Sequence, residues 1–458
     1  MRVQYIIMKK TYFTLLLATA ICFITEAQTY NISTIAGTTT KGFSGDGGLA
    51  TAAEMNQPYG VAVDKAGNVY AAEYGNSVIR KISTSGIITT VAGMGTKNGY
   101  FGDGGAATAA ELNYTTGVAV DTFGNIYIAD NTNSRVRKVN TSGIISTYAG
   151  NGSSGFFGDG GAATAAELNV AAGVAVDQAG DLFIADFYNY RVRKVNRLGK
   201  ISTVAGRGVY GFSGDGGQAT SAEIKSFIGV TVDNVGNVYI ADQANGRIRK
   251  VNTIGIMSTF AGDGNQSFSG DGGPATAAEL SYPYGVGTDA TGNVYIADYG
   301  NERIRVVPKT SIITTIAGDG NVGFYGDGGH ATAAEISTIS GVATDAMGNI
   351  YIADQQNNCI RKLTPVETNV PQLANGNGPI KVYPSPGTGK FTIQSSVGSG
   401  KWSVRIYNIR GENIYTSDTI SNSQFTFDLS NQANGVYLYR VTGEDGKING
   451  EGKIVLQK

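Results

Sequence analysis

The hydrophobic residues of this chain fall in short runs separated by Gly, Asn, Asp and Ser. One stretch contains four such runs in succession, at 117–121, 124–130, 135–139 and 145–150, each rich in Val, Ile, Tyr or Thr. Runs of this composition between turn residues predict β-strands. No segment with helical periodicity long enough for a crossover connection lies between them, so the pattern predicts four antiparallel strands in a row.

The four-strand pattern recurs at a nearly constant spacing. Each copy begins with a Gly-Asp-Gly-Gly motif, and successive motif aspartates lie 57 and then 56 residues apart: Asp46, Asp103, Asp159, Asp215, Asp271 and Asp327. Such a period indicates near-identical units stacked on one another. Six four-stranded units with short turns predict a six-bladed β-propeller. The first run of each unit is almost entirely apolar, as expected for an innermost strand covered on both faces.

The two ends of the repeat region complement each other. A strand of the fourth type, Ile32–Gly37, precedes the first complete unit, whereas the last unit ends at Leu363 without a fourth strand. We expect Ile32–Gly37 to complete the sixth blade, which closes the ring and removes two exposed sheet edges. The predicted fold is therefore all-β: a six-bladed β-propeller closed by an N-terminal strand, plus a small C-terminal β-sandwich domain.

A Thr-Ala-Ala-Glu-like segment follows each glycine-rich motif, as at Thr51–Glu54. Thr-x-x-Glu is the pattern of a helix capping box, in which the hydroxyl and the carboxylate bond backbone amides at the helix start. We therefore expect one helical turn in each loop between blades, and a structural role for these glutamates.

The remaining segments define the domain organisation. Residues 1–27 have a basic start, an apolar core and small residues at the end, which predicts a secretory signal peptide cleaved between Ala27 and Gln28. We expect the propeller at 28–364, an extended linker rich in Pro, Asn and Gly at 365–379, and a separate β domain at 380–458. No other apolar run is long enough for a transmembrane anchor.

Composition argues against several kinds of chemistry. The chain has 35 Lys and Arg against 36 Asp and Glu, with no concentrated basic patch, so nucleic acid is not an expected partner. Its one histidine, His330, cannot form a zinc site by itself. Removal of the leader leaves Cys359 as a lone thiol, which cannot form an internal disulfide. We therefore expect Cys359 to be a small, half-buried apolar residue. We assign no catalytic residue and no metal ligand.

Acidic residues that recur in every blade favour structural roles, because a catalytic group is needed only once. An aspartate at the end of the second strand and an arginine in the third, such as Asp130 and Arg137, recur with the period and predict an ion pair within each blade. The Gly-Asp-Gly-Gly motifs predict turns. No cofactor is expected, although the abundant Asp and Asn oxygens leave a bound calcium ion open.

The repeat unit resembles the NHL repeat. The matching segments are Gly-Val-Ala-Val-Asp (117–121), Gly-Asn-Ile-Tyr-Ile-Ala-Asp (124–130) and Arg-Val-Arg-Lys (135–138), and they recur in all six units over about 28–364. The first unit departs slightly, with Glu73 in place of the usual Asp and Val78 in place of the usual Arg. The resemblance implies a propeller whose glycine-rich loops are of the long type found in secreted bacterial members.

The C-terminal domain resembles the type A sorting domain of the type IX secretion system. The resemblance rests on segments 382–386, 404–408, 428–430, 435–437 and 453–455; Ser385 replaces the usual Asn. It implies that residues 380–458 engage the type IX secretion machinery, carry the chain across an outer membrane and are then cleaved. The product would be secreted or held at the cell surface.

Topology singles out one face for recognition. In a four-stranded antiparallel unit, the loop after the second strand and the loop that enters the next blade lie at the same end. The repeat breaks down at these positions, and loop aromatics offer contact area at low entropic cost. The candidate ligand-binding residues are Tyr59, Tyr74, Phe187, Tyr188, Tyr190, Tyr284 and Tyr299.

These patterns predict a secreted or cell-surface binding and adhesion propeller that recognises a protein or a glycan. The alternative is an enzyme, such as a calcium-dependent lactonase or hydrolase with its site in the central channel. A purely structural surface component is a third reading. The residues that line the channel distinguish these: a cluster of non-repeating acids favours an enzyme, and a ring of equivalent residues favours a scaffold.

Overall fold

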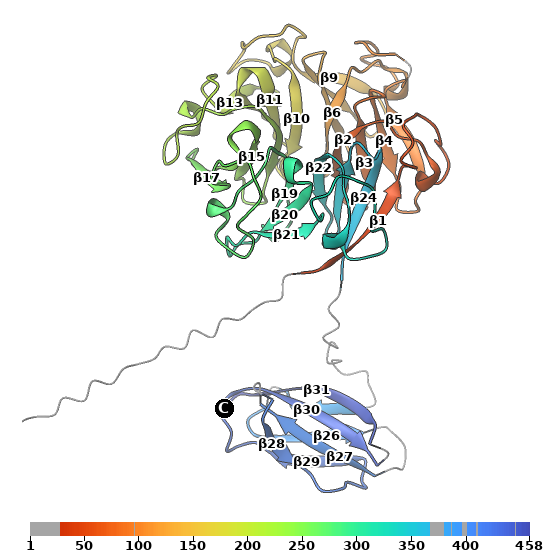
Figure 1. Cartoon of the computed structure of the whole chain (residues 1–458), viewed down its shortest axis with the longest axis vertical. Helices are drawn as coiled ribbons and strands as arrows, with labels where there is room; N and C mark the ends of the chain where they lie inside the picture. The colour runs from red at the N-terminus through yellow and green to blue at the C-terminus, as the bar shows by residue number, and fades with distance from the viewer. Residues whose placement is uncertain are drawn as a thin grey trace, which may run out of the picture. The chain divides into compact units, whose positions relative to one another are not determined.

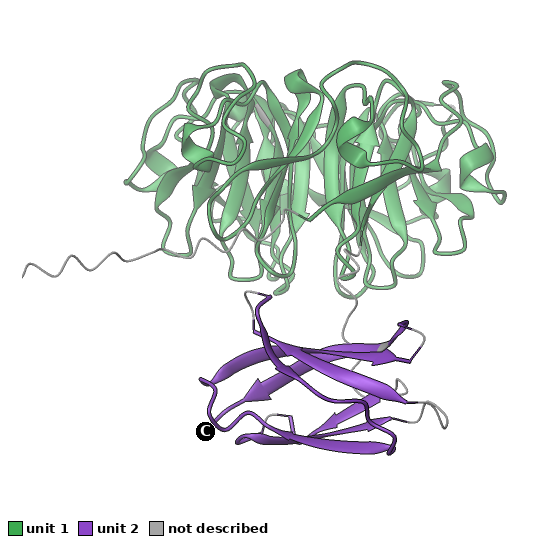
Figure 2. Cartoon of the chain, turned by 60° about the horizontal axis from the view of Figure 1, so that its bottom comes forward, with its two compact units in different colours: residues 1–366 green, residues 367–458 purple. Residues whose placement is uncertain are grey.

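The computed structural model describes residues 28–95, 97–366, 380–385, 387–395, 401–408, 411–444 and 446–458. The chain divides into two compact units, Met1–Val366 and Glu367–Lys458 (Figure 2). The expected leader, 1–27, and most of the expected linker, 367–379, lie outside the described residues.

The described part of the first unit forms six four-stranded antiparallel sheets, set around a central space in Figure 1. The first strand of each sheet lies nearest that space and contacts the first strands of the two neighbouring sheets. These strands are β2 (Pro58–Val63), β6 (Thr115–Val120), β10 (Ala171–Val176), β14 (Phe227–Val232), β18 (Pro283–Thr288) and β22 (Ile339–Thr344).

The outer strands follow in sequence order. The second strands are β3 (Val69–Glu73), β7 (Ile126–Asp130), β11 (Leu182–Asp186), β15 (Val238–Asp242), β19 (Val294–Asp298) and β23 (Ile350–Asp354). The third strands are β4 (Val78–Ile82), β8 (Arg135–Val139), β12 (Arg191–Val195), β16 (Arg247–Val251), β20 (Arg303–Val307) and β24 (Cys359–Pro365). Five sheets end with β5 (Ile88–Ala92), β9 (Ile145–Ala149), β13 (Ile201–Ala205), β17 (Met257–Ala261) and β21 (Thr314–Ala317).

The fourth strand of the remaining sheet comes from the start of the chain. β1 (Tyr30–Ala36) pairs antiparallel with β24, with Ile32 opposite Leu363 and Ser33 opposite Lys362, and the sheet order is β1-β24-β23-β22. The segment that was expected to complete the last unit therefore occupies that edge. Ile32 and Leu363 are both fully buried in one hydrophobic cluster with residues of the neighbouring sheet.

Each first strand carries a glycine because the neighbouring sheet comes too close for a side chain. A Cβ on Gly173 would lie 2.0 Å from the carbonyl oxygen of Ile228, and one on Gly229 would lie 2.4 Å from that of Tyr284. The same relation recurs between the last and first sheets, where a Cβ on Gly341 would lie 2.6 Å from the carbonyl oxygen of Tyr59. The recurrent glycine is thus a packing requirement at the centre of the unit.

The helical turns between sheets are present, but the expected capping box is wrong. Each turn is a three-residue 3-10 helix: η1 (Ala50–Ala52), η2 (Ala107–Ala109), η3 (Ala163–Ala165), η5 (Ala219–Ser221), η7 (Ala275–Ala277) and η9 (Ala331–Ala333). Thr51 lies inside η1, Leu49 is the N-cap residue, and no side chain caps the turn. Because η1 begins one residue before Thr51, the Thr51 side chain is not at the N-cap position from which it could bond the free amides of the turn. Three further 3-10 turns follow second strands: η4 (Phe187–Asn189), η6 (Gln243–Asn245) and η8 (Tyr299–Asn301).

The described residues of the second unit form two sheets around one hydrophobic cluster. One sheet has the order β25-β26-β29 and the other β28-β27-β30-β31. The strands are β25 (Ile380–Tyr383), β26 (Lys390–Ser395), β27 (Trp402–Tyr407), β28 (Asn413–Thr416), β29 (Gln424–Asp428), β30 (Gly435–Gly443) and β31 (Ile448–Leu456). Phe391 and Val404, from different sheets, share the core with the single tryptophan, Trp402.

Candidate ligand-binding site

The first strand of each sheet begins where the second strand ends. Pro58 of β2 lies opposite Glu73 of β3, and Pro283 of β18 lies opposite Asp298 of β19. Tyr59 and Tyr284 therefore sit at the same ends of their sheets as the residues that follow β3 and β19, which are Tyr74 and Tyr299. Strand pairing alone thus places two pairs of candidate tyrosines at the loop-rich end.

Five tyrosines form one continuous series of ring contacts, here named the tyrosine ladder: Tyr114, Tyr74, Tyr59, Tyr284 and Tyr299. Neighbouring ring centroids along this series are 4.7, 5.3, 5.5 and 5.4 Å apart. The outer pairs are stacked, whereas the two central rings meet edge to face. These are favourable arrangements for aromatic pairs. Four of the seven predicted residues, Tyr59, Tyr74, Tyr284 and Tyr299, are therefore brought together.

The centre of the ladder joins two sheets that are not neighbours. β22 lies between β2 and β18 and contacts both. Its residue at the equivalent position is Ser340, a small side chain whose hydroxyl donates to the carbonyl oxygens of Tyr59 and Pro58. Because Ser340 turns toward the backbone, the rings of Tyr59 and Tyr284 meet, and their hydroxyls share a short hydrogen bond.

Burial stabilises the neutral form of three ladder phenols. Tyr284 is only 8% exposed, and burial raises its pKa. Burial also raises the pKa of Tyr59, against the opposing effect of the hydrogen bond from Tyr284, and it raises the pKa of Tyr74. These three residues therefore present protonated hydroxyls at neutral pH.

Sequence reasoning missed Tyr114 as a candidate. It precedes β6, is 37% exposed and stacks on Tyr74. Its backbone has a positive φ of 52°, and its amide donates to the hydroxyl of Ser77 from the preceding sheet. The available signal was that this position does not repeat: the equivalent residues are Gln57, Val170, Ser226, Tyr282 and Thr338.

The other three predicted residues lie apart from the ladder. Phe187 contacts Tyr188 at 4.8 Å between centroids, and Tyr190 contacts Tyr210 at 5.5 Å. Phe187 packs partly into the core beside Ile228, whereas Tyr188 is 56% exposed. No ring contact recorded among the described residues links either pair to the ladder. The predicted aromatic surface is thus divided into separate groups.

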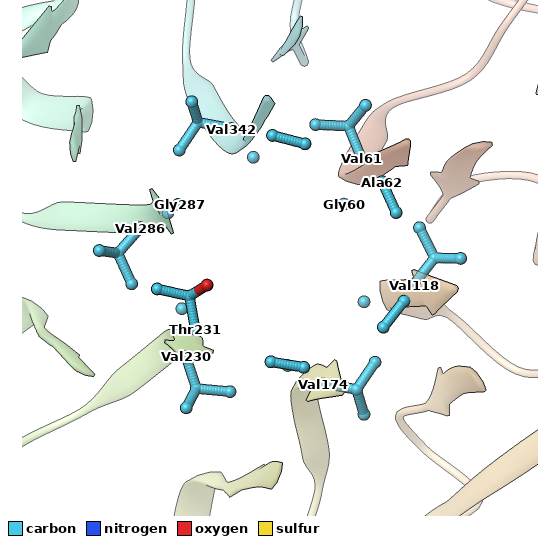
Figure 3. Close-up of a pocket in the computed structure, with 18 of the residues that line it drawn as sticks. Gly60, Val61, Ala62, Val118, Val174, Val230, Thr231, Val286, Gly287 and Val342 are labelled. Carbon is cyan, nitrogen blue, oxygen red and sulfur yellow. The ribbon is translucent and has the colours of Figure 1, made fainter. Parts of the chain in front are cut away.

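The central space contains a cavity of about 250 Å³ whose walls come from the six first strands. Figure 3 shows six valines around it, one from each strand: Val61, Val118, Val174, Val230, Val286 and Val342. The lining is completed by Val63, Val120, Val176 and Tyr59 and by Gly, Ala, Thr, Ile and Ser residues. No Asp, Glu, His, Lys, Arg or Cys is among the lining residues, so the lining is mainly a ring of equivalent apolar residues.

Two acidic residues that recur in each repeat form ion pairs with a buried arginine of the same repeat. The side chain of Arg137 is fully buried; its Nη1 lies 3.3 Å from Asp130 Oδ2, as expected, and its Nη2 lies 2.6 Å from Asp103 Oδ1. The equivalent pairs recur in all six sheets, with Glu73 in place of the aspartate in the first. The sequence did not reveal that the glycine-rich loop supplies the second carboxylate. No group of three or more possible metal-ligating side chains occurs among the described residues.

Comparison with known families follows the same division of the chain. The profile of the teneurin NHL domain matches residues 25–100, 94–155 and 210–269, and that of the NHL repeat matches 168–195. The profile of the secretion system C-terminal sorting domain matches residues 381–457. Within the part of the chain that the structure describes, no helix has the length and hydrophobicity to cross a membrane.

Each of the similar proteins matches only part of this chain. Mouse teneurin-4 is 32% identical over 242 residues, which are 45% of this chain and only 8% of teneurin-4. A protein of unknown function from Bacteroides thetaiotaomicron has a similar structure, with 19% identity, coverage of 74% of this chain and 76% of that chain, and a TM-score of 0.54. An auxiliary nutrient binding protein from Bacteroides ovatus has 14% identity, coverage of 74% of this chain and 78% of that chain, and a TM-score of 0.53. At these identities the structures show the fold alone. This chain is therefore a secreted or cell-surface NHL-repeat β-propeller protein with a C-terminal sorting domain of the type IX secretion system.

Proposed function

We propose that this protein is a binding and adhesion module that recognises a protein or glycan ligand on its loop-rich face. One observation carries the proposal: tyrosines at positions that vary among the blades form a continuous ladder on a scaffold that otherwise repeats. Phe187, Tyr188 and Tyr190 form additional aromatic contact area on the same face. Aromatic rings on loops held by a rigid scaffold are suited to recognition.

The scaffold of this proposal is a closed six-bladed propeller, in which each four-stranded sheet is one blade. Three contacts support closure: one within the last sheet and two between the last and first sheets. β1 pairs with β24, Gly341 packs against the carbonyl of Tyr59, and the side-chain oxygen of Asn358 accepts the amide of Gln57 at 3.0 Å. A closed ring fixes the spacing between loops of distant blades, which a ligand site built from several blades requires.

The proposed processing follows the domain boundaries. Residues 1–27 are removed between Ala27 and Gln28, residues 28–364 form the propeller, and 365–379 are a linker. The sorting domain, 380–458, is recognised by the type IX secretion machinery and is then cleaved. The enzyme alternative receives no support from the channel, whose lining residues include no acid or base.

Binding of the full secreted chain to arrays of glycans and surface proteins tests the function. The double variant Tyr74→Ala/Tyr299→Ala removes two rings from the ladder, and we expect it to lose most of the signal. Tyr325→Ala is the matched control, because Tyr325 is 70% exposed and has no ring contact with the ladder. The proposal fails if no array ligand is retained, or if the two variants bind alike.

A further inference from the structure

The loops that carry the ladder are almost free of charge. They comprise seven four-residue segments, here named the ladder sector: 56–59, 74–77, 113–116, 281–284, 299–302, 337–340 and 355–358. All of them lie in the described part of the chain. Six Tyr, six Asn and three Gln occur in these segments together with Ser, Thr, Pro, Gly and one Ile, and their one charged residue is Glu302.

The carboxyl group of Glu302 is directed into the protein. Its Oε2 accepts the backbone amide of Thr338 at 2.7 Å, across the boundary between two sheets. Burial raises the pKa of Glu302 to about 7, and the negative charge of Asp354 acts in the same direction. The sector therefore carries little charge near neutral pH, and it offers no cation to pair with an acidic ligand.

Several polar groups of the sector have no hydrogen-bond partner among the residues that the structure describes. The structure shows no hydrogen bond to the hydroxyls of Tyr74, Tyr114 or Tyr299 or to the side-chain amide of Gln57 among the described residues. Phenol hydroxyls and amides both donate and accept hydrogen bonds. The sector thus combines a series of aromatic faces with uncharged groups that can bond to alcohols.

We propose that the ladder sector binds a neutral glycan, with sugar rings laid against the tyrosine faces. This inference rests on the proposed binding function and names its ligand class. A pyranose ring has an apolar C–H face that packs on an aromatic ring, and its hydroxyl groups bond to uncharged donors and acceptors. Uronate or sulfated chains need Lys or Arg, which the sector lacks. Protein partners ordinarily meet charged groups at an interface rim, and these complement their own charges.

Titration of the full chain, before the sorting domain is cleaved, with soluble polysaccharides tests the ligand class. A neutral β-glucan and a neutral mannan are compared with polygalacturonate by calorimetry and by the ultraviolet difference spectrum of tyrosine. The single tryptophan, Trp402, lies in the other unit, so its emission serves as an internal reference. We expect at least one neutral glycan to bind with a tyrosine difference signal and unchanged tryptophan emission.

Variants place the glycan on the ladder. We expect Tyr74→Ala/Tyr299→Ala to weaken binding at least tenfold and Tyr325→Ala to leave it unchanged, and thermal unfolding must show that each protein is folded at the temperature of the binding measurement. Equal or tighter binding of polygalacturonate overturns the inference. Ladder-dependent binding of a protein but of no glycan also overturns it, and leaves the proposed function in place. Absence of any ligand, with all variants folded, overturns both.

Discussion

Nη2 of Arg137 lies 2.6 Å from Oδ1 of Asp103, a residue in the glycine-rich loop 34 positions earlier. The same carboxylate accepts the backbone amide and the hydroxyl of Thr147 through its Oδ2. One loop aspartate therefore joins the third and fourth strands of its blade to the loop. The ion pair between the loop aspartate and the third-strand arginine recurs in all six repeats, so the long loops are anchored parts of the scaffold.

Replacement of Asp103 by Ala tests this anchor. Arg137 would remain fully buried with Asp130 as its one carboxylate partner. Loss of a partner from a buried charge typically costs about 3 kcal/mol of unfolding free energy. Asp263→Ala is the control, because Asp263 is exposed and its carboxylate bonds within its own turn; we expect a change of about 1 kcal/mol or less. Equal denaturant midpoints for the two variants would show that the anchor is unimportant.

A second prediction concerns the central glycines. Gly173→Ala would place a Cβ 2.0 Å from the carbonyl oxygen of Ile228, so backbone must move. We expect a loss of about 1–3 kcal/mol of stability, as for other overpacked sites. In Gly217→Ala, the Cβ meets its nearest atom at 3.5 Å, an ordinary contact. Both substitutions lower the conformational entropy of the unfolded chain by the same amount. We therefore expect Gly217→Ala, the control, to be as stable as the parent protein or slightly more stable. Thermal unfolding of both variants measures the difference, and a Gly173→Ala protein as stable as the control contradicts the packing argument.

A third prediction concerns ring closure. A chain without residues 30–36 would expose the edge of β24 along the whole register that β1 covers. Unpaired edges promote association between chains. We expect the shortened protein to aggregate on size-exclusion chromatography and to lose its cooperative thermal transition. A monomer with the original transition would contradict closure by β1.

A fourth prediction concerns pH. Burial raises the folded-state pKa of Glu302 to about 7, above its ordinary value of 4.5. The folded protein therefore takes up this proton more readily than the unfolded chain, and the contribution to stability falls as pH rises from about 4.5 to 7.

Glu302→Gln keeps the acceptor for the Thr338 amide and removes the titration. Comparison of thermal midpoints at pH 4.5 and pH 8 should show that the variant gains stability relative to the parent at the higher pH. A constant difference between the two proteins across this range would exclude a raised pKa at this site.

Local signals explain which elements could be predicted from the sequence. The strand runs, the 3-10 turns and the Asp130–Arg137 pair were expected, because each depends on residues close in sequence or repeated with the period. The capping box was wrong because Thr51 lies inside its turn. The role of Asp103 was missed because it depends on how the loop folds back onto β8.

The sequence by itself determined the repeating four-stranded units and the exposed positions at which those units differ. It could not determine which of the differing residues touch. Tyr59 and Tyr284 are 225 residues apart, and they meet because β22 places the small Ser340 between their sheets. Tyr188, from an equally variable position, lies elsewhere on the face. Only the tertiary structure decides such contacts, since they depend on the positions of the sheets around the axis and on the size of the side chain between them.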